Sequence, residues 1–100
     1  MSKIIFQISY EIKPEKRDEY LSTIKELQTN LKTNSGKNYS VYEDKNKKNY
    51  FSEIYVCQNE EEYENLENET DEITFNLTNK IFSEYITDQK ANYLTLFEIE

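Results

Sequence analysis

Apolar and polar residues alternate along the first segment of the chain, over residues 4 to 12. One set of alternate positions is entirely aliphatic or aromatic, whereas the other includes Gln7, Ser9 and Glu11. Because successive side chains of a strand point to opposite faces of a sheet, this period of two predicts a β-strand. The apolar set comprises Ile4, Phe6, Ile8, Tyr10 and Ile12.

The segment after this strand has the signals of a helix. Pro14 suits the first helical position, and the acidic residues of "KPEKRDEY" suit the positive end of the helix dipole. Gly36, the single glycine of the chain, follows as a stop signal. Between them apolar residues recur at spacings of four, three and four, which predicts one helical stripe formed by Tyr20, Ile24, Leu27 and Leu31.

Two strand-like segments, residues 39–44 and 49–57, flank a turn that is rich in lysine and asparagine. Asn46 tolerates the left-handed backbone conformation that such turns need. The pattern therefore predicts an antiparallel hairpin.

The second half of the chain predicts further helix and a final strand. Asn59 and Glu62 have the spacing of a capping box, so a short helical segment is expected there. After a polar bend at 67–72, we expect a longer helix over about residues 71–86 and a strand over 91–100. The order βαββαβ is that of the ferredoxin-like α+β fold, a four-stranded antiparallel sheet with two helices on one face. We expect residues 1–100 to form one such domain.

The predicted sheet is apolar on both faces. Both sides of its third strand carry aromatic or aliphatic residues. A sheet of this kind needs a cover on both faces, and the chain has helices for only one. We therefore expect a homodimer, a dimeric α+β barrel. Its interface would be the sheet face expected to carry Phe51, Tyr55, Leu94 and Leu96, or the opposite face of the sheet.

The composition argues against several classes of function. Acidic residues outnumber basic ones by 20 to 12, and the net charge of −8 repels phosphate, so nucleic acid is not an expected partner. No apolar run has the length of a membrane span. Histidine is absent, which excludes His-ligated zinc or haem and catalysis by Ser-His or Cys-His pairs. The single cysteine, Cys57, allows no internal disulfide, and a reducing, cytoplasmic location is expected.

Two stretches of the sequence carry a resemblance to a known family. "IKPEKRDEYLSTIKEL" is similar to the strand exit and first helix of the antibiotic biosynthesis monooxygenase family. "YFSEIYVCQNEEEYENL" is similar to that family's glutamate-containing strand and the acidic helix start that follows it. Glu53 matches the recurrent strand glutamate, and Tyr55 stands where an aromatic residue is usual. The resemblance spans nearly the whole chain.

The resemblance implies a small dimeric α+β barrel that acts without a bound cofactor. Its substrate would be an electron-rich aromatic molecule, of hydroquinone or polyketide-like type, that loses a proton and reacts with O₂. Family members usually carry a histidine in the helix after the glutamate strand, whereas this chain has Tyr63, Asn65 and Leu66 in that neighbourhood. The haem-degrading branch of the family needs an axial histidine, so that activity is excluded.

Glu53 is the candidate catalytic residue, and two interpretations of it are open. As a general base it would lie in a partly apolar pocket, where desolvation raises the pKa of a carboxyl. As a structural residue it would accept hydrogen bonds from tyrosine or lysine side chains. No metal site is expected, because the acidic run at 59–72 lacks the EF-hand spacing.

The candidate ligand-binding residues are those that could line a pocket for a flat molecule with rings and polar groups: Gln7, Tyr10, Tyr42, Tyr55 and Tyr93. For the tyrosines, ordinary packing in the core and at an interface is the competing explanation. For Gln7, it is a hydrogen bond to a neighbouring backbone or side-chain group.

Two classes of function remain. One is a cofactor-independent monooxygenase, and the other is a non-catalytic dimeric barrel that binds a small hydrophobic ligand or serves only in assembly. A cavity that holds Glu53 together with tyrosine hydroxyls would favour the enzyme, since ligand sites combine apolar walls with a few polar groups. An RNA-binding domain with the same element order is disfavoured, because the chain is acidic and lacks the RNP pattern.

Overall fold

The computed structural model describes residues 2–34, 36–68 and 71–99. Its main elements, in chain order, are β1 (Ile4–Ile12), α1 (Arg17–Thr29), β2 (Tyr39–Glu43), β3 (Tyr50–Cys57), α2 (Glu60–Asn68), α3 (Glu72–Lys80) and β4 (Ile86–Phe97). A 3₁₀ turn at Pro14–Lys16 leads into α1, and π-helical turns at Asn30–Asn34 and Ile81–Tyr85 extend α1 and α3. Within the described ranges, none of the helices is long and apolar enough to cross a membrane.

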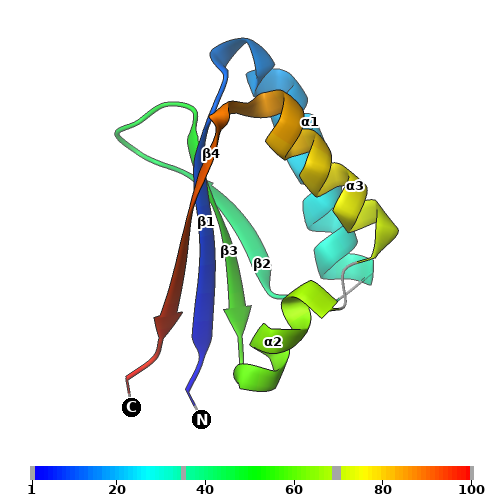
Figure 1. Cartoon of the computed structure of the whole chain (residues 1–100), viewed down its shortest axis with the longest axis vertical. Helices are drawn as coiled ribbons and strands as arrows, with labels where there is room; N and C mark the ends of the chain where they lie inside the picture. The colour runs from blue at the N-terminus through cyan, green and yellow to red at the C-terminus, as the bar shows by residue number, and fades with distance from the viewer. Residues whose placement is uncertain (1, 35, 69–70, 100) are drawn as a thin grey trace.

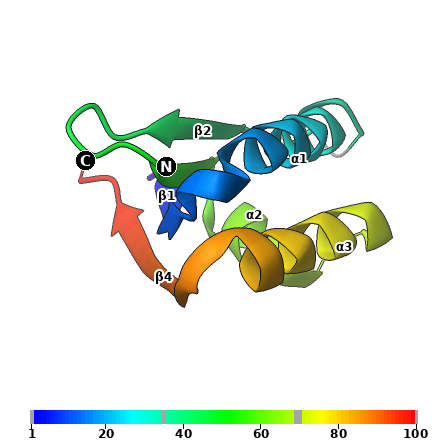
Figure 2. The same cartoon turned by 90° about the horizontal axis from the view of Figure 1, so that it is seen from above.

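The four strands form one antiparallel sheet in the order β2-β3-β1-β4. The helices cover one face of this sheet, with α1 and α3 side by side and α2 near the end where β1 begins and β3 ends (Figure 1, Figure 2). This is the ferredoxin-like α+β architecture, and the element order predicted from the sequence is confirmed.

The apolar stripe predicted for the first helix is its buried face. Tyr20, Ile24 and Leu27 belong to the core between helices and sheet, and Leu31 continues the stripe into the π-helical turn. Gly36 follows with a φ of 62°. Glycine adopts this left-handed conformation without steric cost, so the predicted stop of the helix is also confirmed.

The β2–β3 hairpin turns on a different asparagine from the one that the sequence suggested. The left-handed residue is Asn49, with a φ of 68°, whereas the backbone N–H of Asn46 donates to the Asp44 carboxylate at 2.8 Å. Arg17, at the start of α1, fixes this turn by donating to both Glu43 oxygens, at 2.6 and 2.9 Å, and to Asn49 Oδ1 at 2.8 Å. This tertiary contact accounts for the choice of Asn49, and local propensity does not reveal it.

The last strand begins earlier than predicted. β4 starts at Ile86, directly after the π-helical turn, and its register against β1 shifts between Tyr10 and Ile12. Asp88 and Gln89 have positive φ values of 55° and 53° at this irregularity. Alternation of side chains is lost where a strand bulges, which explains why residues 86–90 did not show a strand pattern.

The register of β1 with β3 and β4 also corrects the dimer face expected from the sequence. That face was expected to carry Phe51, Tyr55, Leu94 and Leu96 together. Tyr55 pairs with Phe6, and Phe6 pairs with Thr95 of β4, so these three residues share the helix-facing side. Phe51 shares this side, whereas Leu94 and Leu96 point to the other one. The expected patch was wrong because alternation defines the two sides of each strand, but only pairing defines which sides belong together.

The sheet face opposite the helices is open in the single chain. Leu94 and Leu96 on it are 48% and 45% exposed. Its polar centre is internally bonded, since the Gln7 amide donates to Ser9 Oγ at 3.1 Å and the Ser9 hydroxyl lies 2.8 Å from the Ser52 hydroxyl. The aliphatic members of this open face are Ile5, Ile54, Val56, Leu94 and Leu96, and the rings of Tyr42 and Tyr50 are on the same face.

Candidate functional site

Glu53 lies in the middle of β3 on the helix-facing side and is buried, with 7% of its surface exposed. Its Oε2 accepts a hydrogen bond from the Tyr10 hydroxyl at 2.5 Å, and its Oε1 accepts one from the Tyr39 hydroxyl at 2.7 Å. The Tyr10 hydroxyl is also 2.8 Å from that of Tyr20. The carboxyl is therefore held on both oxygens by side chains from β1 and β2.

The electrostatics of this cluster follow from its burial. Desolvation raises the pKa of Glu53, and the two hydrogen bonds from Tyr10 and Tyr39 oppose that rise. Burial likewise raises the pKa of both tyrosines, so they remain neutral donors. The two hydrogen bonds therefore offset part of the cost of burying this carboxyl.

A separate pocket of about 180 Å³ lies at the end of the sheet, between β3, α2 and the segment that leads into β2. The segment before β2 contributes polar backbone and side chains, β3 contributes its last three residues, and α2 contributes one face. The lining residues are Gly36, Lys37, Asn38, Tyr55, Val56, Cys57, Glu62, Asn65 and Leu66.

Local structure positions each side of this pocket. The Asn59 side chain accepts a hydrogen bond from the Glu62 backbone N–H at 2.9 Å and so caps α2, as the sequence predicted. The backbone N–H of Val56 donates to the Asn38 carbonyl at 2.9 Å, which holds the segment before β2 against β3. The Lys37 N–H donates to the Leu31 carbonyl at 2.9 Å and fixes that segment to the end of the first helix.

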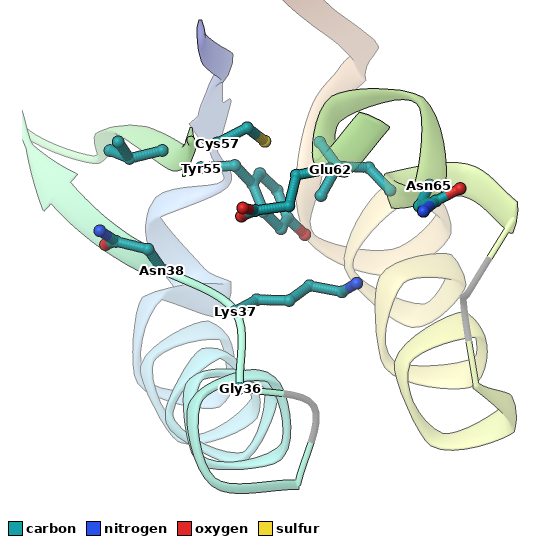
Figure 3. Close-up of a pocket in the computed structure, with 9 residues that line it drawn as sticks. Gly36, Lys37, Asn38, Tyr55, Cys57, Glu62 and Asn65 are labelled. Atoms are coloured by element: carbon teal, nitrogen blue, oxygen red, sulfur yellow. The ribbon is translucent and has the colours of Figure 1, made fainter. Parts of the chain in front are cut away.

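The pocket combines one aromatic wall with opposite charges. Figure 3 shows the Tyr55 side chain between those of Glu62 and Lys37, which extend past it in opposite directions, whereas the Asn65 amide points away from it. Cys57 also lines the pocket, and burial raises the pKa of its thiol. A ring could lie against Tyr55 while its polar substituent meets Lys37 and Glu62.

Tyr55 joins this pocket to the rest of the helix-facing side. Its ring centroid lies 4.8 Å from that of Tyr39 and 6.1 Å from that of Phe6. Phe6 in turn stacks on Tyr93 at 6.2 Å and meets the edge of Tyr63 at 6.1 Å. The wall of the pocket is thus one ring of an extended aromatic cluster.

The structure does not bring the predicted site residues into one cavity. Tyr55 lines the pocket, and Tyr93 belongs to the aromatic cluster beside it. Tyr10 is in the core with Glu53, Gln7 is on the open sheet face, and Tyr42 is exposed on the edge strand β2. The expected combination of Glu53 with several tyrosine hydroxyls is a packed hydrogen-bonded cluster, and Glu53 does not line this pocket.

Sequence reasoning missed the polar residues that line this pocket and one partner of Glu53. Tyr39 was placed on a strand but not linked to Glu53, although the pairing of β2 with β3 brings the two close. Lys37 and Glu62 lie in hydrophilic runs, which read as solvated segments. Among the described residues, no group of three or more His, Cys, Asp or Glu side chains is placed to hold a metal ion.

No protein-family model and no curated protein matches the sequence. Solved structures do match, and one of them is named an antibiotic biosynthesis monooxygenase, with a TM-score of 0.76, 20% identity and 100% of both chains covered. A conserved protein from Methanosarcina mazei Go1 matches with a TM-score of 0.78 and 18% identity, over 96% of this chain and 92% of that one. Rv0793 from Mycobacterium tuberculosis matches with a TM-score of 0.77 and 11% identity, over 98% and 96%. At these identities the match concerns the fold, and the chain has the fold of the antibiotic biosynthesis monooxygenase structures, as the resemblance of its sequence predicted.

Proposed function

We propose that the protein binds a small aromatic molecule with a polar substituent in the pocket between β3, α2 and the segment before β2. The observation that carries this proposal is the combination of the Tyr55 ring with Lys37 and Glu62 around one space of about 180 Å³. A cavity of about 150 Å³ is known to hold one benzene molecule. The pocket is smaller than the roughly 300–1,000 Å³ of drug-sized sites, so a ligand with one ring in it is the expected class.

A second candidate function is oxygenation of that ligand without a bound cofactor. It is supported by the sequence resemblance and by the name of the similar structure. For a phenol, the balanced reaction replaces the hydrogen of one ring carbon by a carbonyl oxygen from O₂. The other oxygen atom of O₂ leaves as water, together with the hydrogen of that ring carbon and the hydrogen of the phenol hydroxyl. Glu53 does not line this pocket, and tyrosine hydroxyls bond both of its oxygens. We therefore adopt the structural interpretation of Glu53.

We further propose that the protein works as a homodimer whose subunits cover each other's open sheet face. The apolar members of that face support this, because Leu94 and Leu96 remain about half exposed in the single chain. Two sheets packed face to face would form the dimeric α+β barrel that the sequence suggested.

Calorimetric titration with phenol and hydroquinone tests the binding site. Replacement of Leu66 by tryptophan fills the pocket and should abolish binding, since the added ring occupies the space of the ligand. Leu21→Trp adds the same bulk on α1 outside this pocket and should leave affinity unchanged. Equal affinities of the two variants would contradict the site. Oxygen consumption by the wild-type protein with the same molecules separates oxygenation from binding alone.

A further inference from the structure

We propose that the lysine-rich turn between β2 and β3 is a docking arm for a second copy of this chain. The lysine arm, formed by Lys45, Lys47 and Lys48, would contact the acidic end of the partner's sheet. This contact would orient the strands of the two subunits antiparallel, with each arm at the far end of the other subunit. The inference rests on the homodimer proposed above and names the contacts that orient it.

The lysine arm lies where a subunit that covers the open face must meet it. The loop between β2 and β3 extends on the side of the sheet away from the helices (Figure 1, Figure 2). All three lysines are exposed, and the Lys47 ammonium lies 4.6 Å from the centroid of the Tyr50 ring. Tyr50 is on the open face, because its neighbour Phe51 is on the helix-facing side.

The lysine arm carries positive charge that the subunit itself does not neutralise. Within the part of the chain that the structure describes, none of the three lysines is in an ion pair. Arg17 donates to both oxygens of Glu43, the carboxylate that precedes the turn, so that acid is already paired. Asp44 is the single acid among the residues of the turn, against three lysines. The arm is therefore a cationic surface on a protein whose net charge is −8.

The opposite end of the sheet carries the complementary charge. Glu98 directly follows β4 and continues the alternation of Leu94 and Leu96, which places it on the side of the open face. Glu60 and Glu61 are exposed in the first turn of α2, at the same end of the sheet. No ion pair within the described ranges involves these three carboxylates. They are available to cations of a second subunit.

Charge favours one of the two ways in which a two-fold axis can relate aligned, face-to-face sheets. With parallel strands, arm would meet arm and acidic end would meet acidic end, and like charges would repel. With antiparallel strands, each arm meets the acidic end of the other subunit, and the contact forms twice. The eight residues of β3 separate the arm from α2 by about 26 Å, so an arm cannot reach the acidic end of its own subunit.

Cross-linking of the wild-type protein with a water-soluble carbodiimide tests the contact, because this reagent joins a lysine to a carboxylate only where the two touch. Peptide mass spectrometry should find links from the lysine arm to Glu98, Glu60 or Glu61. Such links require two subunits, since the groups lie at opposite ends of one sheet. Links from the arm to Asp44 or Glu11 can form within one subunit, and they show that the reagent reached the arm.

Reversal of charge provides the second measurement, with the dimer dissociation constant obtained by analytical ultracentrifugation. Replacement of all three arm lysines by glutamate should weaken the dimer about tenfold or more, because each exposed pair is lost twice and becomes repulsive. The matched control replaces Lys25, Lys32 and Lys80 by glutamate. It has the same net charge, but these exposed lysines belong to the helical layer. Glu98→Lys in the arm variant should recover part of the lost affinity.

The outcomes separate this inference from the homodimer on which it rests. A dimer without links between the lysine arm and the acidic end, or an arm variant that dimerises as well as its control, would overturn the inference and leave the homodimer standing. Circular dichroism of both variants checks that the fold is retained. If the wild-type protein sediments as a monomer, the proposed homodimer fails, and the inference fails with it.

Discussion

Replacement of Glu53 by glutamine tests how the buried carboxyl of β3 contributes to stability. In the wild-type protein both of its oxygens accept hydrogen bonds, from Tyr10 at 2.5 Å and from Tyr39 at 2.7 Å. A protonated carboxyl can still accept both hydrogen bonds, because its hydroxyl oxygen keeps an accepting lone pair, whereas the amide nitrogen of glutamine only donates, so one of the two tyrosine hydroxyls must reverse its direction. Tyr10 has an alternative acceptor, because the Tyr20 hydroxyl lies 2.8 Å away.

The expected loss in the free energy of unfolding for Glu53→Gln is about 1–3 kcal/mol, the cost of a buried polar group with a mismatched partner. The alternative acceptor at Tyr20 places the value toward the lower end of this range. Glu53→Ala is the matched control, because it removes both acceptors, leaves the Tyr39 hydroxyl without its acceptor and leaves Tyr10 only Tyr20. That variant should cost more than Glu53→Gln, about 3 kcal/mol or more, because a cavity adds to the unpaired hydroxyl.

The loss should depend on pH. Burial raises the pKa of Glu53, so the folded protein keeps this proton at pH values above 4.5, where the unfolded chain has released it. The stability of the wild-type protein therefore falls as the pH rises from 4.5 toward the raised pKa, by up to about 1.4 kcal/mol per pH unit. Glutamine does not titrate, so the deficit of Glu53→Gln relative to wild type should shrink over the same range.

Urea unfolding followed by circular dichroism, repeated from pH 4.5 upward, measures this deficit. A deficit that stays constant with pH, or a variant that is more stable than wild type at pH 4.5, would refute the reasoning. The general-base interpretation predicts a different result. Glu53→Gln would then leave unfolding unchanged and reduce turnover of a hydroquinone by about 10²-fold or more.

Two further predictions concern acid stability and assembly. The Arg17 guanidinium lowers the pKa of Glu43 to about 2, so the stability from this pair is present above pH 4.5 and lost as the pH falls toward 2. Arg17→Met should remove this pH-dependent part of the free energy of unfolding, about 1 kcal/mol for a pair so near the surface. Acid-unfolding curves identical to those of the wild type would contradict this prediction. Leu94→Glu should turn the proposed dimer into a monomer in light scattering, while Leu21→Glu on α1 should not. A wild-type protein that is monomeric even in added salt, which screens its net charge of −8, would rule out the dimer.

The sequence by itself determined the order of elements and the side of the first helix that is buried. The spacing of Tyr20, Ile24 and Leu27 is a local periodicity, and the burial of all three follows it directly; the alternation at Ile4 to Ile12 likewise predicted the first strand. Pro14 and Gly36 marked the bounds of that helical region, because their backbone preferences act without tertiary contacts.

Only the tertiary structure decided which sides of neighbouring strands share a face. Tyr55 and Leu94 are apolar positions on strands that are apolar on both sides, so no pattern in the sequence relates one strand to the other. The register through Phe6 does so, and it placed Tyr55 and Thr95 together. It also brought Tyr39 of β2 to Glu53 of β3.

The candidate site was decided in the same way. Lys37, Tyr55 and Glu62 come from the segment before β2, from β3 and from α2, and they meet only because the pairing of β2 with β3 and the turn into α2 bring these segments to one end of the sheet. Charged residues in hydrophilic runs carry no local sign of the pocket that they line. Periodicity records which side of an element is buried, whereas a site depends on distances between elements, and those are determined by register, turns and packing.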